Sequence, residues 1–260
     1  MRLPFADWGG FDTATIRCQR ELARAAAQCA GTAWAVRREC RERALDGGPP
    51  CLADDDPRLG AARSAALDAV DDACSERQLG NLQFLGFLDA QLDLTNFCRH
   101  GWPDAADSLV FTAALDSGGA AARACATAAA DAASDAMRHI FRSRRRGMDH
   151  AAVTPRASPL RAALLTSVAR GKAAASEHLA ARLSARCPDF TARYRRTPAA
   201  FVELLATRAD CIGGAFYIQD AVVCPAAVCG NGIIEFPPET CDDGNAADGD
   251  ACPADCGAER

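Results

Sequence analysis

The chain is poor in aromatic residues and has no long apolar run. The first shortage limits how its core can be built, and the second argues against a membrane protein. Aromatic residues make up only 6% of the 260 residues, so a core has to be built mainly from Ala, Leu and Val. No stretch approaches the roughly eighteen apolar residues of a membrane-spanning helix, so we expect no membrane span. A net charge of −5 with mixed signs argues against a nucleic-acid-binding surface, which would need a basic stripe.

Catalytic signatures are also missing. The histidines are scattered, and none lies in an H-E-x-x-H or C-x-x-C-H context: His100, His139, His150 and His178. The sequence has no G-x-S-x-G motif, no phosphate-binding glycine loop and no dinucleotide fingerprint. We therefore expect a protein that is not an enzyme. A secreted enzyme with an unrecognised site stays open as an alternative.

What the sequence does have is a series of helical patterns separated by Gly and Pro. Helices are predicted over 13–43, 57–74, 79–97, 105–115, 120–141, 159–185 and 198–209, with a loop over 142–158. No stretch alternates with period two, so the expected fold class is mainly α. The prediction is an antiparallel helical bundle held by disulfides, followed by a small irregular cysteine-rich module.

The expected domains are a cysteine-rich helical domain at 13–224 and a cysteine-rich module at 229–256. Cys74 and Cys98 have the same separation as Cys187 and Cys211, and each pair brackets a similar helix–turn–helix pattern. This predicts an internal duplication with copies at about 13–115 and 120–224.

Cysteine is abundant and even in number, which in a secreted chain indicates a disulfide framework. The fourteen disulfide candidates are Cys18, Cys29, Cys40, Cys51, Cys74, Cys98, Cys125, Cys187, Cys211, Cys224, Cys229, Cys241, Cys252 and Cys256. The alternative is thiolate-based binding or storage of Cu or Zn, which would favour cysteines at i and i+3 or i+4. Only Cys252 and Cys256 have that spacing. Zinc bound by the four cysteines of the C-terminal module also stays open.

The first helix carries Cys18, Cys29 and Cys40 at intervals of eleven residues, which places them on one face. Neighbouring cysteines in this row are ~16 Å apart along the axis, so each needs a partner elsewhere. If the second helix folds back antiparallel, we expect the pairs Cys29–Cys74 and Cys40–Cys51. Cys18 would then pair with a later helix, such as the one that ends at Cys98.

The last part of the chain has four cysteines among acidic, amide and glycine residues and almost no apolar side chains, so it needs cross-links to fold. Its sequence, CGNGIIEFPPETCDDGNAADGDACPADC, is similar to the myxobacterial cysteine-rich repeat, C-G-N-G-x-x-E-x-x-E-x-C-D-D-G-N-x-x-x-G-D-x-C-x-x-x-C. The matching residues are Cys229, Gly230, Asn231, Gly232, Glu235, Cys241, Asp242, Asp243, Gly244, Asn245, Gly249, Asp250, Cys252 and Cys256. The usual Pro-Gly-Glu-Glu turn is replaced by Phe-Pro-Pro-Glu-Thr at 236–240.

This resemblance implies a secreted or surface-displayed bacterial protein with disulfides in the module, and it brings no agreed enzymatic activity. The helical part resembles orphan cysteine-rich helical regions of secreted bacterial proteins. We expect an exported structural or interaction protein whose partner is another surface protein or an envelope component. The expected location is secreted or at the cell surface, although residues 1–8 contain no apolar segment typical of a signal peptide.

Two charged clusters suggest ligands. The oxygen-rich residues of the module would suit calcium, although Asp and Asn in such a loop more often shape turns: Glu239, Asp242, Asp243, Asn245, Asp248 and Asp250. No other cofactor is expected. The arginine-rich run at 142–146 could contact an anionic surface or lie in a solvated loop.

Overall fold

The computed structural model describes residues 11–51, 53–82, 84–115, 119–154, 159–214, 228–230, 239, 241, 247–249 and 252–257. Within these residues the protein is helical and contains no strand, as the sequence predicted. The elements are α1 (Thr13–Leu45), the 3₁₀ turn η1 (Ala53–Asp55), α2 (Pro57–Ala73), α3 (Glu76–Asn81), α4 (Phe87–Asn96), the π turn η2 (Phe97–Gly101), α5 (Trp102–Leu115), α6 (Gly119–Ala152), α7 (Pro159–Arg186), α8 (Phe190–Tyr194) and α9 (Pro198–Gly214).

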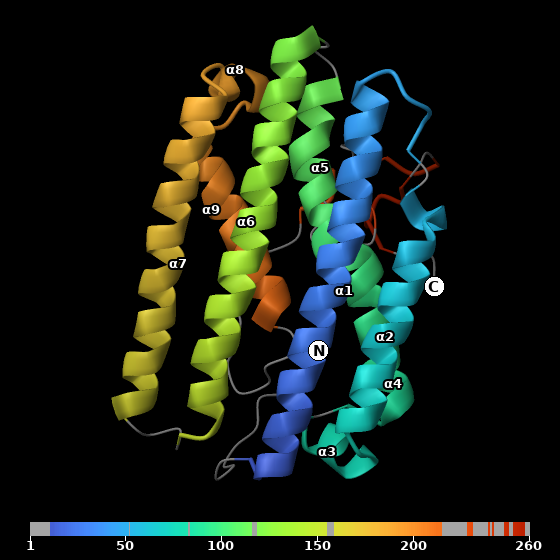
Figure 1. Ribbon diagram of the computed structural model, residues 1–260, viewed down its shortest axis with the longest axis vertical. Coiled ribbons are helices and arrows are strands. Elements are labelled where there is room, and N and C mark those ends of the chain that lie inside the picture. Colours follow the sequence, from blue (N-terminus) through green and yellow to red (C-terminus); the bar gives the residue numbers. More distant parts are fainter. Residues whose placement is uncertain are drawn as a thin grey trace.

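The long helices form two layers (Figure 1). In one layer α2, α1, α6 and α7 lie side by side, and α6 runs antiparallel to α1 and α7. In the other layer α5 lies behind α1 and α6, and α9 lies behind α6 and α7. Since α6 contacts α1, α5, α7 and α9, it is the central helix of the bundle.

Local signals fix both ends of α1. The side chain of Asp12 accepts a hydrogen bond from the backbone N–H of Thr15 at 2.6 Å and so caps the first turn. At the other end Gly47 adopts a φ of 86°, and the N–H of Gly48 donates to the carbonyl of Arg43. A left-handed glycine after the last turn is a common way to end a helix.

The predicted loop over 142–158 is wrong for its first part, because α6 continues to Ala152. Arginine is a good helix former, and the repulsion within the run is reduced by ion pairing. Arg144 contacts Asp210 of α9 at 2.7 Å, and Lys172 of α7 contacts the same carboxylate at 3.2 Å. The arginine run is therefore part of a helix packed in the bundle.

The predicted helices over 79–97 and 105–115 are divided differently in the structure. The break comes at Gly86, whose φ is 140°, and it separates α3 from α4. There is no break at Pro103, because α4, η2 and α5 continue with helical backbone angles at their junctions. The π turn ends two residues before Pro103, which has no N–H for a regular helical hydrogen bond.

A single core joins both halves of the chain. Its bulkiest fully buried side chains come from α1, α5, α8 and α9: Trp34, Trp102, Phe111, Phe190 and Phe201. Alanines fill most of the buried face of α6, as expected from the composition. Small side chains on this central helix allow its four neighbours to pack closely against it.

Candidate functional site

Three disulfides anchor one face of α1 at three levels. Cys18 pairs with Cys74 after α2, Cys29 pairs with Cys98 in η2, and Cys40 pairs with Cys51 before η1. Their Cα–Cα distances of 4.8, 5.2 and 5.2 Å are ordinary for disulfides. Cys18, Cys29 and Cys40 therefore lie on one face of α1, as predicted, and the predicted Cys40–Cys51 pair is confirmed.

The predicted pairing of Cys29 with Cys74 is wrong, because Cys74 is level with Cys18. Once Cys40 and Cys51 are bonded, they fix the register of the antiparallel helices α1 and α2. The number of residues from Cys51 to Cys74 matches that from Cys40 back to Cys18 to within one. Since both segments are mainly helical, they cover a similar length, so Cys74 reaches Cys18 and leaves Cys29 for Cys98.

The remaining cysteines with described positions are also oxidised. Cys125 of α6 pairs with Cys187 after α7, and Cys211 is disulfide-bonded, whereas Cys224 lies outside the described residues. In the C-terminal module the pairs are Cys229–Cys256 and the enclosed Cys241–Cys252. No described cysteine is free. This density of disulfides favours an oxidising, extracellular environment.

The two parts of the helical domain repeat the same order of elements. A long helix (α1 or α6) is followed by a helix that ends just before a cysteine (α2 or α7), a short helix (α3 or α8) and a further helix (α4 or α9). Cys18 and Cys125 lie near the starts of α1 and α6, and each pairs with the cysteine that follows the second helix, Cys74 or Cys187. This agreement favours the duplication, which stays a prediction.

The side chains of the two parts agree less well. When the two parts are aligned on Cys74 and Cys187, Val70 matches Leu183, and both are buried. In the same alignment Leu88 and Leu92 of α4 match Phe201 and Leu205, but they are 70% and 54% exposed. Their aligned partners Phe201 and Leu205 are buried in α9. The reason is that α9 packs on α6 and α7, whereas α4 lies at the edge of the bundle against α2 and η2.

The structure describes only part of the candidate calcium cluster. Glu239 is buried, whereas the exposed Asp248 accepts a hydrogen bond from the backbone N–H of Ala254 at 2.9 Å. That hydrogen bond is the turn-forming role that the sequence also allowed. The other candidates, Asp242, Asp243, Asn245 and Asp250, lie outside the described residues. Calcium binding stays a prediction.

A group of possible metal ligands that the sequence did not indicate lies between α6 and α8. Asp189 places an oxygen 3.2 Å from the sulfur of Cys125, beside the Cys125–Cys187 disulfide. Sulfurs bonded to each other are not thiolates, and the carboxylate is held by Arg193 at 2.7 Å. Hydrogen bonding from Arg193 lowers the pKa of Asp189. Asp189 therefore acts as an ion-pair partner in this oxidised state.

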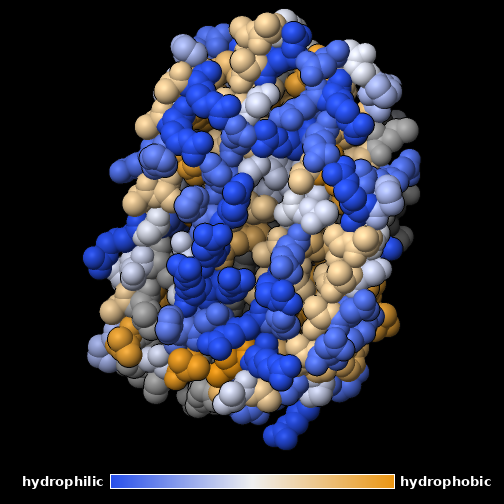
Figure 2. Space-filling model, viewed as in Figure 1, coloured by the Kyte–Doolittle hydropathy of each residue, from blue (hydrophilic) through white to orange (hydrophobic). Residues whose placement is uncertain are grey.

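The outer face of α1 and α6 carries a groove of about 1130 Å³. Its apolar lining includes Ala27, Gly31 and Ala35 of α1 and Met137 of α6. Figure 2 shows this face, where hydrophilic side chains flank a hollow with paler, less polar atoms inside. Beside the groove, Trp34 donates from Nε1 to Oγ of Ser134 at 2.8 Å, which joins the two helices.

The charges around this groove are paired across three helices. Asp131 of α6 contacts Arg38 of α1 at 2.8 Å and also contacts Arg186 of α7, and Asp135 contacts Arg182 of α7 at 2.9 Å. Partial burial by itself raises the pKa of Asp131, but hydrogen bonds from Arg186 and Arg38 and the charge of Arg38 lower it overall. The network joins α1, α6 and α7 and leaves little net charge in the groove.

A second hollow of about 420 Å³ opens between α1, η2 and α6. Its apolar lining includes Phe97, Met137 and Phe141, and its charged lining consists only of arginines: Arg24, Arg138, Arg142 and Arg145. The sequence indicated the arginine run but placed it in a loop. It could not show that a helix brings two of these arginines beside aromatic side chains from a different part of the chain.

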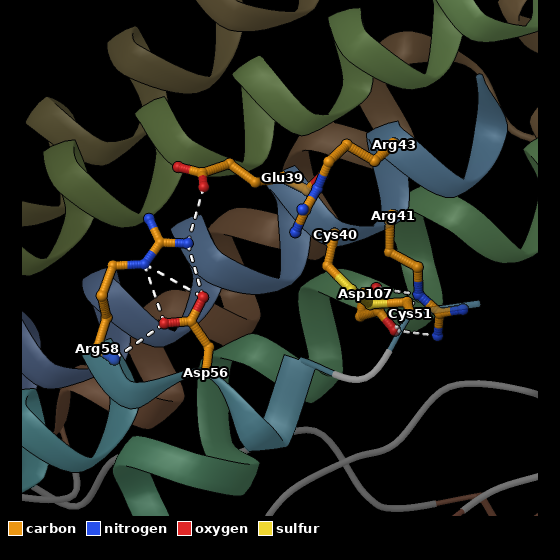
Figure 3. The surroundings of a disulfide bond; sticks show 8 residues. All are labelled: Glu39, Cys40, Arg41, Arg43, Cys51, Asp56, Arg58 and Asp107. Atoms are coloured by element: carbon orange, nitrogen blue, oxygen red, sulfur yellow. Dashed lines mark hydrogen bonds and ion pairs between the residues drawn. A yellow bond between two sulfur atoms is a disulfide. The ribbon is translucent and has the colours of Figure 1, made fainter. Parts of the chain in front are cut away.

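Ion pairs also surround the Cys40–Cys51 disulfide (Figure 3). Arg41 contacts Asp107 of α5 at 2.6 Å on one side of it. On the other side Arg58 of α2 contacts Glu39 at 2.9 Å and Asp56 at 2.8 Å. The end of α1 is thereby fixed by a covalent bond to the segment before η1, and by ion pairs to α2 and α5.

These features define a mainly α, disulfide-bonded bundle with an irregular cysteine-rich module. In comparisons with known proteins, no family model, curated protein or solved structure gives a significant match. The similarity of residues 229–256 to the myxobacterial cysteine-rich repeat therefore stays a prediction. Among the described helices, none combines the length and apolar character that crossing a bilayer requires.

Proposed function

We propose that this chain is an exported bacterial structural or interaction protein that acts without catalysis. The observation that carries the proposal is the oxidation of every described cysteine, with α1 cross-linked at three levels. Such cross-links persist outside the reducing cytosol and restrict the motion of the bundle. A rigid bundle with a fixed outer surface suits a scaffold or a binding partner.

The chemistry of the described surface supports binding over catalysis. Asp131 and Asp135 beside the large groove are already occupied as ion-pair partners of arginines. His139, His150 and His178 are exposed on α6 and α7 rather than gathered in a hollow. The proposed partner is another surface protein or an envelope component, which agrees with the resemblance of the C-terminal module to a repeat of surface-displayed proteins.

The test is a count of free thiols in the natively exported protein, by alkylation and intact mass with and without reductant. We expect no alkylation without reductant and fourteen added groups after reduction. Protease treatment of intact cells should also remove the surface-displayed fraction, while a cytosolic control protein survives. Many free thiols with bound Cu or Zn would instead support the metal-storage alternative.

A further inference from the structure

The hollow between α1, η2 and α6 combines an aromatic wall with a basic rim. The ring centroids of Phe97 and Phe141 are 6.2 Å apart, and that of Trp102 is 6.4 Å from Phe141. Phe97 and Phe141 line the hollow directly, together with Ala23 and Ala27 of α1. An apolar chain or ring placed here would exchange water for carbon contacts, which is favourable.

The rim of this hollow differs from that of the larger groove, because two of its four arginines form no ion pair with a described acid. Arg24 is paired with Glu21 at 2.6 Å, and Arg138 is 3.5 Å from Asp135. Arg142 and Arg145 have no carboxylate partner among the described residues. They lie three positions apart on α6, so they project from the same side of the helix. Two guanidinium groups with free donors suit a carboxylate or phosphate, which they can bind in a bidentate manner.

We propose that this hollow binds a single-chain anionic amphiphile, of the fatty-acid class. The apolar chain would lie against Phe97, Met137 and Phe141, and the carboxylate would be bound by Arg142 and Arg145. The volume of about 420 Å³ is at the smaller end of the roughly 300–1,000 Å³ found for small-molecule sites, which fits a medium-length chain. This site goes beyond the proposed export and scaffold role and does not depend on it.

The experiment is isothermal titration of the oxidised full chain with hexanoate, octanoate and decanoate, each below its micelle concentration. We expect saturable binding with one site. The affinity should rise with chain length, by up to about fourfold for each added methylene that becomes fully buried. Acetate, inorganic phosphate and decyltrimethylammonium are the controls, and all three should bind much more weakly than decanoate.

Two variants test the two halves of the site. The double variant Arg142→Gln/Arg145→Gln should weaken decanoate binding by about tenfold or more, because two charge-assisted contacts are lost. The matched control Arg146→Gln/Arg170→Gln removes the same charge from exposed positions outside the hollow and should leave the affinity unchanged. Ala27→Leu should weaken binding by filling the hollow, and circular dichroism shows whether each variant keeps its helices.

Several outcomes would overturn the proposal. Equal affinity for acetate or phosphate would indicate a simple anion site, and equal affinity for decyltrimethylammonium would indicate apolar contact alone. Equal loss in the two arginine double variants would show a general charge effect. Binding to vesicles with anionic lipid but not to decanoate would assign the basic surface to a membrane headgroup layer and not to a pocket.

Discussion

Asp131 illustrates how single side chains join the helices of this bundle. Its carboxylate on α6 is shared by Arg38 of α1 and Arg186 of α7, and the folded protein lowers its pKa below the ordinary value. A lowered carboxyl pKa stabilises the fold at pH values above the unfolded pKa. That contribution is lost as pH falls through the folded pKa, here below about pH 4.

Replacement of Asp131 by Asn should therefore remove part of the acid sensitivity of the fold. We expect Asp131→Asn to lower stability at pH 7 by up to about 1 kcal/mol, because the pairs are partly exposed. The difference from wild type should shrink at pH 3. Melting temperatures at both pH values check this, with Asp68→Asn, at an exposed position of α2, as a control for the loss of one surface carboxylate. A constant difference at all pH values would contradict the explanation.

Gly86 and Gly60 should respond oppositely to substitution by alanine. Gly86 has a φ of 140°, and an added Cβ would lie 2.8 Å from an oxygen of Glu76. Gly86→Ala should thus destabilise the fold by about 1–3 kcal/mol. Gly60 lies in α2 with open space around it, so Gly60→Ala should stabilise by up to about 1 kcal/mol. Urea unfolding of both variants checks the difference in sign, and stabilisation by Gly86→Ala would refute the strain argument.

At the level of elements, local signals predicted the helices well. Pro57 begins α2, as predicted, with Asp56 as its N-cap, and α2 ends immediately before Cys74. The errors came where a non-local contact decides the outcome. The helix through the arginine run depends in part on Asp210 of α9, and that contact is not visible in the local sequence.

The disulfide pairing could be predicted only in part for a similar reason. Cys40 and Cys51 are joined by a short turn, so their pairing follows from local geometry. Cys98 reaches Cys29 because η2 packs against α1, and this packing is set by the whole bundle. The two arginines of the basic hollow were visible in the sequence, but the aromatic wall beside them was not.

The three disulfides of α1 should differ in how much they stabilise the fold. In the chain-entropy model, removing the Cys18–Cys74 bond, which spans 56 residues, costs about 4 kcal/mol, and removing the Cys40–Cys51 bond, which spans 11, costs about 3 kcal/mol. Paired alanine substitutions and urea unfolding measure both values. A larger loss for Cys40–Cys51 would show that strain or residual structure outweighs loop entropy.

At the scale of the whole molecule, the two parts of the helical domain share one core. Buried residues of α1, α5, α6 and α9 belong to a single hydrophobic cluster, so neither part buries its own apolar surface alone. We expect one cooperative unfolding transition, in which tryptophan fluorescence and far-ultraviolet circular dichroism coincide. Two separated transitions would indicate that each copy of the proposed duplication folds independently.

The three anchor points on α1 also affect the fate of a cut chain. A protease that cleaves within residues 46–50 would leave both new ends covalently joined through Cys40–Cys51, and the other two bonds would still hold α1 to the rest of the bundle. The nicked protein should migrate as one species on a non-reducing gel and as two after reduction. Outside the cell, where proteases are common, such a chain could be cleaved in this loop and still keep its shape.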